Sequence, residues 1–297
     1  MKPHVLEFLR SGLKITKARG HLVVLVQDDE IKIPLDDVFS ALILSEDILI
    51  STNVVTAFVE RNIPILFCDG KYNPVASLIN YFGHHLMQRH QNLQIALSEN
   101  QKGRLWQKII KNKISNQAAL LKTLKKNEGL MSKFIQEVEV HDQTNIEAQA
   151  AKYYWRALFG SDFRRDQNGG GVNSFLNYGY AILRSAVARY VATVGLSPLL
   201  GIHHSNQSNP FCLIDDLMEP FRPLVDNLCY HMKSESELNP EVKKKLASVL
   251  LHLVNYKNEE KALSSALSEY SYSFLSAVIE GDYKTFDLEF QLNFYDV

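Results

Sequence analysis

The stretch Asp215-Asp216-Leu217-Met218-Glu219-Pro220-Phe221-Arg222-Pro223 carries the strongest structural signal in this chain. Asp216 and Glu219 are three residues apart, so on a helix they share one face, and Arg222 continues that face one turn later. The two prolines predict a helix start or a kink at this point. The segment therefore predicts a helical turn that presents carboxylates and a guanidinium together.

A second polar segment, Gly201-Ile202-His203-His204, lies just upstream of this turn. An imidazole and two or three carboxylates within one short span are suited to holding a divalent metal against a phosphodiester. A structural alternative stays open, because a lone histidine is more often structural and the acidic turn is also explained by pairing with Arg222. Asp215 fits that alternative best, as no more than a solvated helix start.

Glu147 adds a further acidic position upstream, within a helix expected over residues 145–159. The residues that share its helical face are apolar or aromatic, namely Ala151, Tyr154, Trp155 and Leu158. Glu147 is therefore expected on the face that packs inward. A buried carboxylate is costly unless it is paired or bound to a metal. Pairing with a lysine or arginine elsewhere and metal binding both remain open.

The first 75 residues predict strands instead. Alternating or valine-rich runs favour strands over 13–17, 21–26, 31–33, 47–50 and 63–67, with turns at Asp28-Asp29 and Asp69-Gly70 and a helix over 54–61. After Asn73-Pro74 the pattern becomes helical, with helices expected over 145–159, 172–194 and 259–280. The sequence thus predicts an α+β fold, with a β-rich domain over 1–75 and an all-α catalytic domain over 76–297.

Composition narrows the class of protein. The chain has 297 residues and 46% apolar content, enough for a sizeable core, and contains no run that could span a membrane. Charged residues interrupt the N-terminus, so no signal peptide is expected. Cys68, Cys212 and Cys229 are widely spaced, which favours a reducing compartment and hence the cytoplasm.

Net charge is −1, but basic residues are concentrated between Arg89 and Lys126, where the only acid is Glu99. This tract predicts either a solvated helix face or a surface that follows a phosphate backbone. The sequence contains no phosphate-binding loop of the G-x-x-x-x-G-K-[ST] type and no G-x-S-x-G nucleophile motif.

At four places the chain resembles Cas1, the CRISPR-associated endonuclease/integrase of spacer acquisition, and most of all its type II branch. The matching segments are Ile146-Glu147-Ala148 with Tyr154-Trp155, the tract 173–183, Gly195-Leu196-Ser197-Pro198 leading to the histidines, and 216–223. Many members carry Gly where this chain has Ala148. The resemblance covers nearly the whole length.

The resemblance implies roles for particular residues. Glu147, His204 and Glu219 would be the catalytic metal ligands, with His204 preferred over His203 because the family places its histidine three residues after the glycine. Asp216 would support the site as a further acidic residue. Asn173 and Tyr178 lie in a tract near the DNA backbone in this family. The candidate nucleic-acid contacts are Asn173, Arg164, Arg165 and Arg222.

The resemblance also implies the reaction and the partners. With Mg²⁺ or Mn²⁺, the 3′-OH of a captured DNA fragment would attack a phosphodiester at the edge of a CRISPR repeat. The implied partners are double-stranded DNA (prespacer and repeat), a second copy paired through the β domain, the small subunit Cas2 and the effector nuclease Cas9. A general metal-dependent nuclease or resolvase on branched DNA is the alternative, and a non-catalytic helical scaffold is a third.

Overall fold

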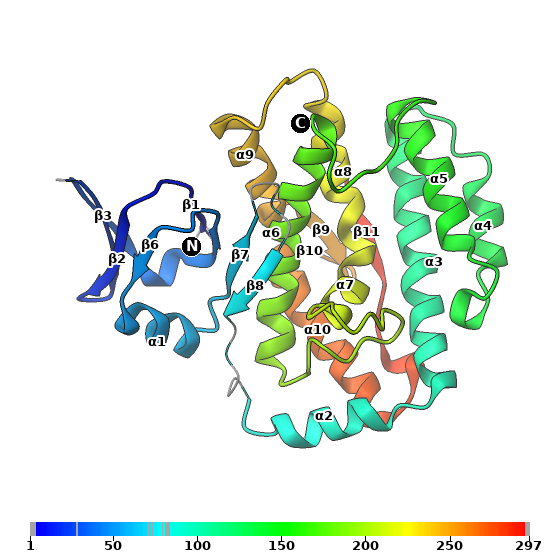
Figure 1. The fold of residues 1–297 in the computed structure, drawn as a ribbon. Coiled ribbons are helices and arrows are strands. Elements are labelled where there is room, and N and C mark those ends of the chain that lie inside the picture. The colour runs from blue at the N-terminus through cyan, green and yellow to red at the C-terminus, as the bar shows by residue number, and fades with distance from the viewer. Residues whose placement is uncertain are drawn as a thin grey trace.

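The computed structural model describes residues 4–27, 29–69, 72, 74–78, 80 and 84–294. The turns expected at Asp28 and Gly70, and Asn73 at the expected change of pattern, lie outside these residues. Strands dominate the chain up to residue 78, and helices dominate it from residue 87 onward (Figure 1). The predicted α+β class is confirmed.

The strand-rich part contains two four-stranded sheets within the described residues. In the first, β3 (His21–Val26) pairs antiparallel with β4 (Asp29–Pro34) and with β2 (Leu13–Ala18), and β6 (Ile48–Ile50) lies parallel to β2. In the second, β1 (His4–Phe8), β5 (Val38–Ile43) and β7 (Ile65–Cys68) are parallel and β8 (Pro74–Leu78) is antiparallel to β7. Helix α1 (Thr52–Glu60) joins β6 to β7.

Strand β5 joins the two parts of the molecule. All six of its residues are buried, the continuous apolar run of a strand covered on both faces. Its Phe39 carbonyl accepts a hydrogen bond from Arg189 at 2.8 Å, and Ser185 donates to Ser40 at 3.0 Å. The second sheet therefore packs directly against α6, as Figure 1 shows for β7 and β8. The sequence did not reveal β5, because a strand buried on both faces lacks period-two alternation.

Helices build the larger part of the protein around one long central helix, α6 (Val172–Thr193), which is buried along most of its length. Helix α6 contacts α7 (Cys212–Met218), α8 (Arg222–His231), α9 (Pro240–Ala247) and α10 (Leu263–Glu280). The remaining helices are α2 (Met87–Ala96), α3 (Glu99–Thr123), α4 (Met131–Glu137) and α5 (Ile146–Phe159).

Three short strands interrupt this helical part, which is therefore not the all-α domain that was expected. Strand β9 (Leu253–Tyr256) pairs antiparallel with β10 (Glu259–Ala262) and with β11 (Phe290–Leu292). Lys257 and Asn258 both adopt positive φ, 53° and 61°, as in the two-residue turns that favour hairpins. The helix expected over 259–280 consequently begins only at Leu263. Among the described residues, no helix is long and apolar enough to cross a membrane.

The contact between α6 and α8 leaves no room for a side chain at Gly179. A Cβ there would lie 2.4 Å from Cγ1 of Val225. We therefore expect Gly179→Ala to lower the free energy of unfolding by about 1–3 kcal/mol, the usual cost of overpacking. Urea denaturation measures this change. Gly170→Ala is the matched control, because nothing lies within 4 Å of a Cβ at Gly170; equal stability of the two variants would contradict this packing.

Candidate active site

Four segments, three of them consecutive between residues 201 and 221, meet beside helix α3. They are the first turn of α5, the loop 201–209, helix α7 and the 3-10 turn Glu219–Phe221 (Figure 1). Three of the residues selected from the sequence, Glu147, His204 and Glu219, lie on these segments. The local structure of each segment determines where its side chain lies.

Glu147 lies in the first turn of α5, where Asp142 fixes the start of the helix. The Asp142 carboxylate accepts hydrogen bonds from the backbone N–H of Ile146 at 2.8 Å and of Glu147 at 2.9 Å. A helix N-terminus leaves these N–H groups without intrahelical partners. Asp142 thus acts as the cap, since the Asn145 side chain makes no capping bond. The Glu147 side chain is 24% exposed and points toward α3.

Glu219 is almost fully buried and both of its carboxylate oxygens face cations. Arg222 Nε lies 2.9 Å from Oε1, and Lys113 Nζ lies 2.6 Å from Oε2. Burial disfavours the ionised form, but the charges of Arg222 and Lys113 outweigh it and hold the pKa of the Glu219 carboxyl well below its ordinary value. Glu219 is therefore an anion inside the protein.

Lys113, on α3, also binds Glu147. Its buried ammonium donates a hydrogen bond to Glu147 Oε1 at 2.6 Å, the same distance as to Glu219. Burial favours the neutral amine, yet Glu219 and Glu147 together raise the pKa of Lys113. One cation thus lies between the two carboxylates that the sequence selected as metal ligands.

The loop that carries His204 is held by Asp216. This carboxylate is fully buried and accepts hydrogen bonds from the backbone N–H groups of Ile202 (2.7 Å), His203 (3.1 Å) and His204 (3.2 Å). A Cβ at Gly201 would lie 2.3 Å from the His204 carbonyl oxygen, so only glycine fits the approach of this loop. Asp216 therefore supports the site by shaping the loop.

Asp216 also orients the His204 ring. Its Oδ1 lies 2.6 Å from His204 Nδ1, and because a carboxylate can only accept, Nδ1 carries the proton. This hydrogen bond raises the pKa of His204 against the effect of burial. The neutral ring then presents the lone pair of Nε2, the arrangement typical of metal-binding histidines. Glu219 lies close enough to contribute to the raised pKa.

Trp106 of α3 packs against both histidines. Its ring is stacked on His203 with centroids 4.1 Å apart and planes 2° apart, and it meets His204 edge-on at 5.8 Å. The Trp106 side chain is fully buried. The His203 ring therefore lies flat against α3.

A cavity of about 390 Å³ opens beside Lys113 and Glu219. Arg165 and Arg222 both line it, and both guanidinium groups lie over the Tyr180 ring, at 5.6 and 4.6 Å. Asp226 closes its inner end and accepts hydrogen bonds from the hydroxyls of Tyr154 and Tyr180. The cavity thus joins Glu219 to two arginines, a residue type that can bind phosphate oxygens.

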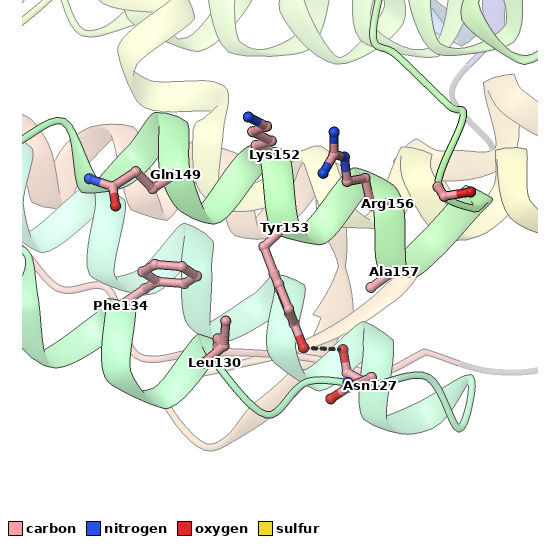
Figure 2. A pocket seen from close by; sticks show the side chains of 9 residues that line it. Asn127, Leu130, Phe134, Gln149, Lys152, Tyr153, Arg156 and Ala157 are labelled. Atoms are coloured by element: carbon pink, nitrogen blue, oxygen red, sulfur yellow. Dashed lines mark hydrogen bonds between the residues drawn. The ribbon is translucent and has the colours of Figure 1, made fainter.

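Among the described residues, no three His, Cys, Asp or Glu side chains already converge as a metal-ligand group. The physical reason is the Lys113 ammonium, which lies between Glu147 and Glu219. A larger cavity, of about 580 Å³, lies between α4 and α5 (Figure 2). Lys152 and Arg156 lie at its rim above Phe134 and Tyr153, and no carboxylate or histidine lines it.

A family model for CRISPR associated protein Cas1 matches residues 7–258. The CRISPR-associated endonuclease Cas1 of Neisseria meningitidis serogroup C is 33% identical over 288 residues, which cover 94% of each chain. The chain belongs to the Cas1 family. Its resemblance to that family in the sequence is thereby confirmed, and the family is one of endonucleases and integrases of CRISPR systems.

Other relatives agree with this assignment. A Cas1 endonuclease of Pyrobaculum aerophilum is 28% identical over 244 residues, which cover 76% of this chain and 81% of the relative. Among solved structures, a casposase bound to an integration product has a TM-score of 0.81 at 16% identity, covering 100% of this chain and 96% of that one. A Cas1 protein from Thermotoga maritima has a TM-score of 0.76 at 15% identity, covering 94% and 98%. At these identities the two structures show the fold alone.

Two expectations about charged residues were wrong. Asp215 is not a solvated helix start, because it is buried and pairs with Arg184 at 2.7 Å and with Asn209 at 2.9 Å. Lys113, counted in the basic tract, belongs neither to a solvated face nor to a surface that follows DNA. Elsewhere in the tract, Lys108 donates to the Phe286 carbonyl, whereas Lys102 forms an exposed ion pair with Glu99 at 3.0 Å.

The candidate DNA contacts differ in their exposure and in their hydrogen-bond partners. Arg165 lines the cavity and donates to Asn173 Oδ1 at 3.2 Å and Asn177 Oδ1 at 2.6 Å. Asn173 in turn donates to the Arg164 carbonyl at 3.1 Å, so it holds the loop before α6. The Arg164 side chain is exposed on that loop. Tyr178 is buried and donates to Glu7 at 3.3 Å.

Lys113, Trp106 and Asp142 were not predicted from the sequence. A signal for Lys113 existed, because it falls on the apolar stripe of α3 between Ile109 and Ile114, where a lysine needs a buried partner. Asp142 caps a helix that begins only four residues further on, whereas Trp106 acts through contacts that form only when α3 meets the distant loop 201–209.

Asp226 gives the site a measurable pH dependence. Burial raises its pKa to about 6, despite the opposing hydrogen bonds from Tyr180 and Tyr154 and the charges of Arg222 and Arg165. The folded protein therefore binds more protons than the unfolded chain between about pH 4 and pH 6. Stability contributed by this group is present at low pH and is lost as pH rises through that window.

We expect Asp226→Asn to remove this loss. Relative to the parent, the free energy of unfolding of the variant should rise by about 3 kcal/mol between pH 4 and pH 7, from a difference of about two pKa units. Urea denaturation at several pH values measures it. A difference between the two proteins that does not vary with pH would contradict the assignment.

Proposed function

We propose that this Cas1 family member is a divalent-metal-dependent DNA integrase whose site is Glu147, His204 and Glu219. The observation that carries the proposal is that one oxygen of Glu147 and one of Glu219 each lie 2.6 Å from the Lys113 ammonium, with His204 close enough to Glu219 for its charge to act on the ring. Asp216 acts through the loop and the ring of His204.

The residues fit Mg²⁺ or Mn²⁺. Two carboxylates and a neutral imidazole are the donor set that these ions accept, with positions left for water and phosphate oxygens. The point between the two carboxylates is occupied by an ammonium, so this place already accommodates a cation.

The proposed reaction is a transesterification. The 3′-OH oxygen of a captured DNA end forms a bond to phosphorus at the edge of a CRISPR repeat, and the existing P–O bond to the repeat strand breaks, leaving a new 3′-OH. A divalent ion, which Glu147, His204 and Glu219 would hold, would polarise the phosphate and lower the pKa of the attacking hydroxyl. Arg165 and Arg222 bind phosphate oxygens in the cavity, and Asp216 keeps the His204 ring in its metal-binding tautomer.

The proposal also covers the roles of the two domains and the partners of the protein. Residues 1–75 would form the surface that pairs two copies, with residues 76–297 as the catalytic domain. A solved Cas6-RT-Cas1–Cas2 complex contains a chain like this one, with a TM-score of 0.75 at 16% identity, covering 100% of this chain and 36% of that one. We propose Cas2 and double-stranded DNA as partners, and Cas9 as a further one. The three cysteines are buried free thiols, in keeping with a cytoplasmic location.

Changing any proposed ligand should abolish joining of DNA ends. Glu147→Gln, His204→Ala and Glu219→Gln should each lower strand transfer at least about a hundredfold, since changing even a residue that only hydrogen-bonds to a metal ligand costs about 10–100-fold. The measurement is transfer of a labelled duplex with 3′-OH ends into a supercoiled plasmid, with Cas2, in Mn²⁺ or EDTA. Glu137→Gln, in an exposed ion pair on α4, is the control.

The same assay distinguishes an integrase from the alternative function, a general nuclease or resolvase. Metal-dependent cutting of branched DNA without joining would favour a general nuclease or resolvase. Parental joining in Glu219→Gln would show that the site is misassigned.

The exposed end of the basic tract gives a separate prediction. Lys122 and Lys125 lie exposed at the end of α3. If they bind phosphates, the double change to alanine should reduce the slope of log affinity against log salt by about 0.9 for each phosphate that is no longer neutralised. DNA titrations at several salt concentrations measure this slope. An unchanged slope would make this end of α3 a solvated face.

A further inference from the structure

Lys113 lies where a metal would have to bind. Its side chain is 9% exposed, and its ammonium is 2.6 Å from one oxygen of Glu147 and 2.6 Å from one oxygen of Glu219. We propose that Lys113 is a built-in counter-ion, which keeps the two carboxylates together without metal and moves aside when a divalent cation binds. This inference rests on the proposed metal site.

The two carboxylates require such a counter-ion. Two like charges this close inside a protein repel strongly, and each is costly to bury without a partner. Arg222 does not solve this problem, because it contacts only Oε1 of Glu219 and does not contact Glu147. Lys113 alone, among the described residues, forms ion pairs with both. A divalent ion between the same oxygens would compensate both charges and make the ammonium superfluous there.

A second acceptor for the displaced Lys113 ammonium lies nearby in the cavity. Lys113 lines the cavity of about 390 Å³, and so does Gln117, one helical turn further along α3 and on the same face. Gln117 is buried, and its Oε1 has no hydrogen-bond partner in the described structure. The lysine side chain is a flexible four-carbon stem, so its ammonium can turn from the carboxylates to this acceptor without movement of the helix.

This movement would link metal binding to DNA binding. In the cavity, the ammonium would join Arg165 and Arg222, the two cations that line it already. Metal entry would then add one positive charge to the place where a phosphate is proposed to bind, and it would do so only after the metal has arrived. Lys113 is thus a positioning residue that acts through Glu147 and Glu219.

The test is the affinity of the full-length protein for Mn²⁺, measured from free Mn²⁺ by electron paramagnetic resonance. Lys113→Met removes the competing cation and leaves two unpaired carboxylates, so it should bind Mn²⁺ at least about tenfold more tightly than the parent. In EDTA the same variant should unfold at a lower temperature, by roughly 5 °C or more. Lys122→Met, exposed on the same helix, should match the parent in both measurements.

Lys113→Met is expected to raise Mn²⁺ affinity and to lower the melting temperature. These opposite changes distinguish a counter-ion from a lysine that only packs in the core. A lysine that only supports the fold would, when removed, lower stability and leave Mn²⁺ affinity equal or weaker, which would overturn the proposal. Failure of the metal site itself looks different: the parent would then bind no Mn²⁺, or Glu147→Gln and Glu219→Gln would bind it as well as the parent.

A double variant keeps the test decisive if Lys113→Met folds poorly. Adding Glu147→Gln removes one of the two repelling charges, so Lys113→Met/Glu147→Gln should regain much of the lost melting temperature in EDTA. No recovery would overturn the pairing. Lys113→Gln, which keeps a polar side chain of similar length, should also bind Mn²⁺ more tightly than the parent, and weaker binding would contradict the proposal.

Discussion

Charge compensation between α3, α5 and the turn at Glu219 is the interaction on which the site depends. Two carboxylates are brought together in the helical core, where each would be strongly destabilising without a cation. The ammonium of Lys113 forms ion pairs with both at 2.6 Å, and Arg222 forms an ion pair with the other oxygen of Glu219 at 2.9 Å. The fold therefore holds two carboxylates against one ammonium, at the point where a divalent cation is proposed to bind.

The surrounding structure serves to hold this arrangement rigid. Asp142 fixes the helix start that carries Glu147, and Asp216 fixes both the loop and the tautomer of His204. Trp106 supports the histidines from α3, and Gly201 allows the close approach of their loop. Asp142 acts on the first turn of α5, whereas Asp216, Trp106 and Gly201 all act on the loop of His204; both structures meet at α3.

The sequence predicted the candidate ligands better than their environment. Glu147 was predicted on an inward face by its apolar neighbours at helical spacing, and Glu219 with Arg222 by their three-residue spacing, both of which are local patterns. The roles of Asp215 and Lys113 depend on partners at distant positions, Arg184 and the two glutamates, which spacing along the chain does not reveal. Strand β5 was missed because it is buried on both faces and so lacks the alternation of apolar and polar residues that marks a strand. The hairpin β9–β10 was missed because the two-residue turn at Lys257 and Asn258 pairs Glu259–Ala262, the start of the helix expected over 259–280, with β9 as a strand.

Glu147, Glu219 and His204 are proposed to form one metal site, and every other role assigned around them depends on it. Anomalous X-ray diffraction from crystals soaked in Mn²⁺ tests this site most directly, because it locates the ion without reference to activity. We predict a single peak between the two glutamates, within bonding distance of His204 Nε2, with the Lys113 ammonium turned toward Gln117. No peak at this place, or a peak elsewhere with Lys113 still between the carboxylates, would contradict it.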